Sequence, residues 1–289
     1  MASLRDIRRR IKSIKNTAQI TKAMQMVAAS KMRKAQEAAL NGRPYAFLLN
    51  RVLVSLRDRV DQNLHPLLEK REVKNELVVV LSTDKGLCGA LNTNLFREAT
   101  AFDTQKTKFV SVGRKGTQFL ARTKRNMIAD FPLKEQPTFL EAKSISKFLI
   151  ERFLSGDVDK VTVLYPRFVN TLTQKPTALT LLPITSLEEA GLTGTSESPI
   201  PEPAGDIIFE PSPEKILAEI VPYYVHFALY QMLLATRASE HSARMVAMKS
   251  ATDNAKDIVK DLTLEYNKAR QAAITKELLE ITTAQLALG

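Results

Sequence analysis

The sequence is poor in the residues that build disulfide frameworks and metal clusters. Its one cysteine, Cys88, excludes a disulfide within the chain and a cysteine-rich metal site. The three histidines, His65, His226 and His241, are scattered and predict no metal site. We expect Cys88 to be a small buried side chain in a reducing compartment, and His241 to be packed within the fold or an interface.

Aromatic side chains are missing where a tight interface would need them. There is no tryptophan, residues 1–44 contain no aromatic residue, and Tyr230 and Tyr266 are the only aromatic residues after Phe227. Alanine, serine, threonine and methionine take their place, as in MQMVAASKMRK at 24–34. Because aromatic and arginine anchors make the strongest interface contacts, this composition predicts shallow ones. Plain helix propensity explains much of the same pattern.

Long apolar runs are also missing. Residues 220–236 carry no formal charge, but Pro222, Tyr224 and Gln231 interrupt a stretch that is already shorter than a membrane span. A buried helix is the better interpretation. The charged start of the chain, from Arg5 onward, predicts no secretory signal.

Positive charge is concentrated at one end of the chain. Residues 1–60 contain 14 Lys and Arg against Asp6, Glu37 and Asp58, which leaves +11, the net charge of the whole chain. The other 229 residues are balanced, with 28 residues of each sign. This asymmetry predicts an electrostatic partner such as an acidic protein surface, anionic lipid or nucleic acid, with a merely solvated helix face as the alternative.

A heptad pattern of apolar and small residues predicts a long N-terminal helix over residues 1–60. Pro44 interrupts the pattern and should kink or restart the helix. The seam comprises Leu4, Ile7, Ile11, Ile14, Ala18, Ala28, Met32, Ala35, Ala39, Ala46, Leu49, Leu53, Leu56 and Val60.

The C-terminal region, residues 212–289, shows the same pattern after a helix start signal at Ser212, Pro213 and Glu214. Its seam comprises Ile220, Tyr224, Phe227, Leu234, Ala238, His241, Met245, Met248, Thr252, Ala255, Val259, Leu262, Tyr266, Ala269 and Ala273. Two heptad helices at opposite ends of one chain bury their seams most simply as an antiparallel coiled coil.

Residues 75–188 change to the pattern of a small α/β domain, Rossmann-like in its alternation of strands and helices. Expected strands are 76–82, 109–113, 160–165 and 177–184, and expected helices are 91–102, 117–123 and 138–155. The sheet should be open and largely parallel. Residues 189–211 are rich in Pro, Gly, Ser and Glu, which predicts a surface loop.

The segment TDKGLCGALNTN at 83–94 lies between a strand and a helix, where α/β proteins bind phosphates. The spacing of Gly86 and Gly89 matches neither common phosphate-binding motif, which favours a structural turn. No serine triad or carboxylate pair stands out in the sequence, and no cofactor is indicated. Two alternatives stay open, namely a nucleotide-binding α/β enzyme and a nucleic-acid-binding coiled coil.

Three segments resemble the gamma subunits of F-type ATP synthases, bacterial type. They are LRDIRRRIKSIKNTAQITKAMQMVAASKMRKAQ near the N-terminus, the central STDKGLCGALNTNL, and ASEHSARMVAMKSATDNAKDIVKDLTLEYNKARQAAITKELLEI near the C-terminus. The resemblance implies a non-catalytic shaft inside a ring of three alpha and three beta subunits. It also implies that the α/β domain rests on the membrane c ring beside the epsilon subunit. Rotation of the c ring by proton flow would drive ATP synthesis in the beta subunits, reversibly, and the shaft would regulate ATPase activity and proton flow.

The resemblance also implies which residues meet the partners. The alpha and beta subunits are expected to contact Arg8, Arg9, Lys12, Lys22, Met24, Lys31, Arg33, Arg244, Gln271 and Thr275. The c ring and epsilon are expected to contact Phe209, Glu210 and Pro211. No transmembrane span or nucleic acid partner is implied, and a peripheral position on the cytoplasmic face of the bacterial plasma membrane is expected. Cys88 alone cannot form the redox-active pair of chloroplast members.

Overall fold

The computed structural model describes residues 4–42, 44, 45, 48, 49, 52, 65–184 and 212–288. The chain divides into two compact units. Unit 1 comprises Met1–Ala28 with Arg244–Gly289, and unit 2 comprises Ala29–Ala243. The two terminal helices, α1 (Leu4–Asn41) and α6 (Pro213–Leu288), each contribute to both units.

Unit 1 is an antiparallel helix pair. The Arg8 guanidinium lies 5.4 Å from the centre of the Tyr266 ring, and the hydroxyls of Thr21 and Thr252 are 2.7 Å apart. Because the partner number falls as the α1 number rises, the helices run in opposite directions. The predicted seam is confirmed along α6, where each of its members from Met245 to Ala273 is buried or half-buried. Along α1, Thr21 and Gln25 fill the gap that the predicted seam left between Ala18 and Ala28.

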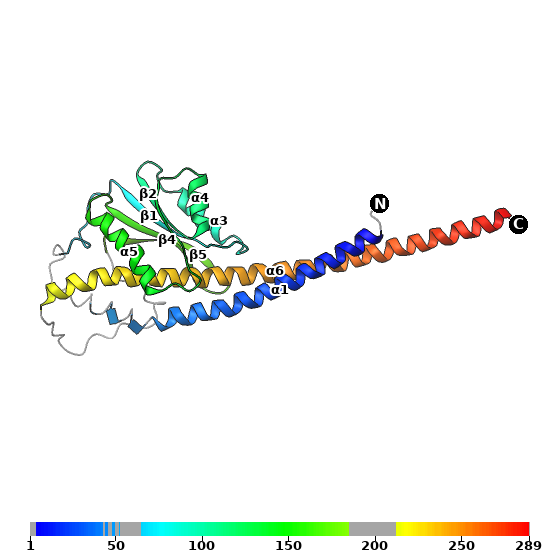
Figure 1. Cartoon of the computed structure of the whole chain (residues 1–289), viewed down its shortest axis with the longest axis horizontal. Coiled ribbons are helices and arrows are strands. Elements are labelled where there is room, and N and C mark those ends of the chain that lie inside the picture. Colours follow the sequence, from blue (N-terminus) through cyan, green and yellow to red (C-terminus); the bar gives the residue numbers. More distant parts are fainter. Residues whose placement is uncertain are drawn as a thin grey trace. The chain divides into compact units, whose positions relative to one another are not determined.

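Unit 2 contains a five-stranded sheet in the order β3-β2-β1-β4-β5 (Figure 1). Strands β1 (Glu76–Leu81), β2 (Thr107–Val112), β3 (Met127–Phe131) and β4 (Lys160–Phe168) are parallel. Strand β5 (Gln174–Leu182) pairs antiparallel with β4. The run ELVVVL of β1 is almost wholly buried, as expected of a central parallel strand covered on both faces.

Helices cover both faces of this sheet. On one face α3 (Leu91–Thr100) and α4 (Arg114–Arg122) pack through Leu95 and Leu120 onto Val78. On the other face α5 (Phe139–Leu154) and the N-terminal part of α6 form the larger core around Leu77 and Val79 (Figure 1). Helix α5 begins with a capping box in which Thr138 and Glu141 bond each other's backbone amides.

The fold class expected from the sequence is confirmed, with two differences in the sheet. Strand β3 was missed, and the expected strand at 177–184 is an antiparallel edge strand, so the sheet is mixed. Helix α6 begins at Pro213 after Ser212, whose hydroxyl accepts the backbone N–H of Lys215 at 3.4 Å. The extension of the first helix to residue 60 falls mostly outside the described residues.

The charge-free stretch at 220–236 is part of α6 and lies largely in the core of unit 2. Val221, Val225, Leu229 and Leu233 are at most 1% exposed, and Pro222 sits within the helix. Over the described part of the chain, no helix is long and apolar enough to cross a membrane.

Candidate partner interface and the crevice of the α/β domain

The exposed face of α1 in unit 1 is strongly basic. Up to Ala28, Asp6 is the single acidic residue of this helix, and its 3.4 Å ion pair with Arg9 is well exposed. The basic residues are Arg5, Arg8, Arg9, Arg10, Lys12, Lys15 and Lys22. The predicted contact residues Arg9, Lys12 and Lys22 are exposed, and Arg8 is exposed while it also contacts Tyr266. This surface therefore carries a dense positive field.

The partner helix carries no such excess. Between residues 244 and 285, α6 holds seven Lys and Arg and six Asp and Glu. The predicted contact residues Gln271 and Thr275 are exposed, and Arg244 is half-buried. The helix pair therefore presents a basic side and a nearly neutral side, so it is electrostatically asymmetric.

The end of α6 has no buried side chains among those described. Every described side chain from Ile274 to position 285 is exposed, and Leu278, Leu279 and Ile281 are 58–61% exposed. Large apolar side chains that stay in water in the isolated chain are typical of a surface that a partner covers.

The remaining predicted contact residues are not simply exposed residues of unit 1. Met24 is half-buried beside the seam of unit 1. In unit 2, Arg33 is exposed, whereas Lys31 forms an ion pair with Glu135. The hydrogen bond from Lys31 lowers the pKa of the Glu135 carboxyl. Phe209, Glu210, Pro211 and the 189–206 loop lie outside the described residues.

The turn after β1 is the segment for which the sequence suggested a nucleotide site. Hydrogen bonds within the chain stabilise this turn. The Asn92 side-chain amide donates to the Thr83 hydroxyl at 2.8 Å and to the Cys88 sulfur at 3.4 Å, and Cys88 is buried as expected. The Ser82 hydroxyl accepts the backbone N–H of Gly116, in the first turn of α4, at 2.7 Å.

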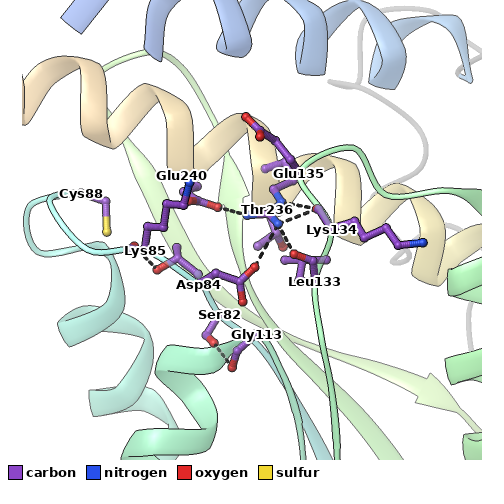
Figure 2. Close-up of polar contacts among 12 residues, drawn as sticks. Ser82, Asp84, Lys85, Cys88, Gly113, Leu133, Lys134, Glu135, Thr236 and Glu240 are labelled. Carbon is purple, nitrogen blue, oxygen red and sulfur yellow. Dashed lines mark hydrogen bonds and ion pairs between the residues drawn. The ribbon is translucent and has the colours of Figure 1, made fainter. Parts of the chain in front are cut away.

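A buried guanidinium occupies the space next to this turn. The Arg237 side chain is 5% exposed and donates to Lys134 O at 2.9 Å, to Leu133 O, to Glu240 Oε2 at 2.5 Å and to Asp84 Oδ2 at 3.3 Å. We call these five residues the Arg237 cluster. Figure 2 shows Asp84 beside Lys85, Leu133 beside Lys134, and Glu240 on α6, where the three segments converge.

Two serines of α6 continue the contact. The Ser239 hydroxyl donates to Pro166 O in β4, and the Ser242 hydroxyl donates to Thr171 O, each at 2.7 Å. Ligands of α/β sheets bind beyond the carboxyl ends of the strands where the strand order reverses, which here is between β1 and β4. Because Arg237, Ser239 and Ser242 fill that crevice, the geometry favours a structural turn over a nucleotide site.

The histidines also serve packing. His65 and His241 are buried, and His226 Nδ1 lies 2.6 Å from the Ser146 hydroxyl, which joins α6 to α5. Within the described residues, no group of three or more His, Cys, Asp or Glu side chains could hold a metal ion.

The sequence interpretation did not find the Arg237 cluster. One signal was available, because Arg237 and Glu240 are opposite charges three positions apart directly after a charge-free helical stretch. That spacing also occurs on solvated helices, so it could not by itself show that the pair is buried.

Comparison with known proteins gives matches along nearly the whole chain. A family model described as ATP synthase matches residues 3–288. The ATP synthase gamma chain of Methylacidiphilum infernorum is 52% identical over 294 residues, covering all of both chains. The gamma chain of Opitutus terrae is 51% identical over 292 residues, covering 99% of each.

Solved structures give matches of the same kind. A chain from the central stalk and c ring of the Tetrahymena thermophila mitochondrial ATP synthase superposes with a TM-score of 0.61 at 27% identity, covering 80% of this chain and 99% of that chain. A chain from the Euglena gracilis mitochondrial ATP synthase has a TM-score of 0.68 at 22% identity, covering 99% and 94%, and supports the fold alone.

Proposed function

Because the chain belongs to the family of ATP synthase gamma chains, we propose that it is the central rotor shaft of an F-type ATP synthase. The observation that carries the proposal is a full-length match to gamma chains combined with an antiparallel helix pair whose two sides differ in charge. The chain is a non-catalytic subunit, and the catalytic sites lie on the beta subunits. Its partners are three alpha and three beta subunits, epsilon and the c ring.

The charge asymmetry of unit 1 contributes to the coupling. A rotor orientation shifts a catalytic site between conformations only if it interacts differently with each of them. As the shaft turns, each beta subunit meets first the basic side of α1 and then the nearly neutral side of α6. Charges attract over about 8 Å at physiological salt without requiring one fixed geometry, so such contacts can slide.

The basic residues of α1 can supply the free energy that coupling requires only if nearly all of them are paired. Reversing a two-state equilibrium from 1:99 to 99:1 takes about 5.5 kcal/mol of differential binding. Exposed ion pairs contribute roughly 0.2–1 kcal/mol each, so the seven cations of α1 supply about 1–7 kcal/mol even if all are paired.

The individual contact residues belong to the same proposal. Arg8, Arg9, Lys12, Lys22, Met24, Lys31, Arg33, Arg244, Gln271 and Thr275 are assigned to the alpha and beta subunits. Phe209, Glu210 and Pro211 are assigned to the c ring and epsilon. The subunit is peripheral, and its location is the cytoplasmic face of the bacterial plasma membrane, supported by the bacterial source of its relatives.

Reconstitution tests the proposal. The chain, combined with alpha, beta, epsilon and c-ring subunits in vesicles, is expected to support ATP hydrolysis and ATP-driven proton pumping. Replacing Arg9, Lys12 and Lys22 together by Gln should weaken pumping and its dependence on salt. The matched control replaces the exposed Lys256, Lys260 and Lys268 of α6 by Gln and should change pumping less. Absence of any activity with the unmodified chain would refute the proposed function.

A further inference from the structure

The two long helices are fastened to the α/β domain in different ways. Helix α6 is fixed by the Arg237 cluster, whose acceptors come from the turn after β1, the segment after β3 and α6 itself. Arg237 and Glu240 side chains are 5% and 2% exposed, so water does not compete for these bonds. Buried charge-assisted hydrogen bonds of this kind are the strong ones.

The direction of these bonds matters as much as their strength. A guanidinium is a planar fork with donors in fixed directions, so its acceptors set both the rotation of α6 about its axis and its position along that axis. The apolar contacts of Leu229 and Leu233 also hold α6 against the domain. These interdigitated side chains oppose rotation as well as separation, and the bonds of Arg237 add fixed directions to that packing.

Further bonds reach other sides of the helix. At about 100° per residue, position 239 lies about 160° around the helix from position 237. Ser239 bonds to β4 and Ser242 to the connection between β4 and β5. Helix α6 is therefore bonded on several sides, to strand β4 and to the segments that follow β1, β3 and β4.

Helix α1 makes weaker contacts with the α/β domain in the same unit. Lys31 pairs with Glu135, but their side chains are 40% and 55% exposed, and exposed pairs are weak. Beside this pair a groove of about 530 Å³ lies between α1, α6 and the segment after β3, and is lined by Ala35, Arg237 and Pro137, among others. The packing of α1 against the domain is therefore incomplete here.

From this contrast we infer that Arg237 is the residue through which the α/β domain turns α6. Torque then enters the shaft through the C-terminal helix, and α1 follows because its contact with the domain, through Lys31 and Glu135, is weaker. The inference rests on the proposed function. It makes Arg237 a positioning residue, because it touches no catalytic site and acts by holding α6 at one angle to the domain.

The experiment uses the complete complex in vesicles and measures protons pumped per ATP hydrolysed. Arg237→Met keeps the side-chain length and removes the donors. It should leave ATP hydrolysis within about twofold and lower the pumping ratio about threefold or more, because the domain slips relative to α6. Arg237→Lys should restore part of the ratio. Glu135→Gln, which loosens the contact of α1 instead, is the matched control and should keep the ratio.

An unchanged ratio in Arg237→Met would overturn the inference. So would parallel losses of hydrolysis and pumping in complexes that contain all subunits, because they leave the ratio unchanged. If Arg237→Met does not assemble, Asp84→Asn decides, since it removes the negative charge of a partly exposed partner of Arg237 and leaves the carbonyl contacts. A smaller loss of ratio is expected there, and no loss would overturn the inference. An unmodified complex that never pumps would refute the proposed function itself.

Discussion

At the scale of single residues, Gly113 occupies the tightest backbone position at the carboxyl end of β2. Its φ is +101°, and a Cβ there would lie 2.5 Å from the Ser82 carbonyl oxygen. Both the conformation and the space therefore require glycine. We expect Gly113→Ala to lower the free energy of unfolding by about 2–4 kcal/mol, measured by denaturant titration.

Two other glycines are matched controls for this prediction. Gly86 has open space around it and no positive φ, so Gly86→Ala should change stability by less than about 0.5 kcal/mol. Gly156 has open space but a φ of +74°, so Gly156→Ala should cost about 1 kcal/mol, from the backbone alone. Equal effects at Gly113 and Gly156 would show that the contact with Ser82 is unimportant.

The burial of a single residue was predictable where the chemistry of its own side chain decided it. A lone cysteine and an isolated histidine on a heptad seam are normally packed, and Cys88 and His241 are buried. Arg237 was not predictable, because a charged residue is buried only when several acceptors from distant segments meet it. Its acceptors at positions 84, 133 and 134 are 103 or more positions away in sequence.

At the scale of elements, the Thr21–Thr252 pair is a polar layer in the apolar seam of unit 1. Each hydroxyl also contacts a backbone carbonyl of its own helix, Ala18 O for Thr21 and Met248 O for Thr252. Replacing both by Val removes both partners, so we expect unit 1 to keep its stability or gain up to about 1 kcal/mol. The gain should come with a less strictly specified register.

Thermal unfolding and cysteine cross-linking would check this pair. The melting temperature should not fall in the double variant, whereas cross-links between α1 and α6 should appear at more than one register. Thr263→Val is the control, because Thr263 is exposed and bonds only within its own helix, to Val259 O. A large loss of stability in the double variant would contradict the prediction.

The contact between α5 and α6 should depend on pH. Burial, and to a lesser extent the charge of Lys143, lowers the pKa of His226. The folded state then binds protons less readily than the unfolded state, so stability falls as pH drops below the unfolded pKa of about 6.5. His226→Gln should reduce this slope between pH 7.5 and 5.5, measured as the shift of the thermal midpoint.

Two considerations isolate the histidine effect. Ser146→Ala removes the hydrogen bond to His226 but leaves the imidazole buried, so it should keep the slope. The pKa values of Glu135, Asp157 and Asp159 are lowered as well, and their contribution is lost only below about pH 4. The pKa of His65 is also lowered by burial, so part of the slope should survive in His226→Gln.

The elements themselves could largely be predicted, because periodicity is a local property. The C-terminal heptad helix, the start of the N-terminal one and the central strands β1, β2 and β4 were located within a few residues. Strand β3 was missed because Met127–Phe131 is a short edge strand without a buried apolar run. The antiparallel direction of β5 was not predicted, although the 11 residues between the expected strands at 160–165 and 177–184 are fewer than a parallel crossover needs.

At the scale of the whole molecule, we expect Met24→Lys to impair function more than truncation after Leu278. Truncation removes side chains that, as far as position 285, are exposed, so it leaves the described packing intact. A lysine at position 24 would place a charge beside the seam of a helix that already carries seven cations before Ala28. Proton pumping per vesicle should fall several-fold in Met24→Lys.

Comparable pumping by the two variants would show that this ranking is wrong. Gln25→Lys is a useful control, because Gln25 is also half-buried and lies one position further along α1. A loss confined to Met24→Lys would place the effect on the face that meets the beta subunits, while equal losses would place it in the seam.

The candidate interface could be predicted only in part from the sequence. Counting charges located the basic element, and the exposure of Arg9, Lys12 and Lys22 follows from a heptad that buries other positions. Charge gives the sign of a partner surface but not its shape, so the identity of the partner came from the resemblance. That the helix pair has a basic side and a nearly neutral side could be seen only once α1 was found paired with α6.

The filled crevice between β1 and β4 also affects competition for that space. The segment from Arg237 to Ser242 is covalently part of the chain, so it acts as a tethered ligand with an effective concentration of at least millimolar order. A free nucleotide would have to displace this segment and leave Asp84 and Glu240 without Arg237. We therefore expect the α/β domain to keep its structure whatever the nucleotide concentration around it.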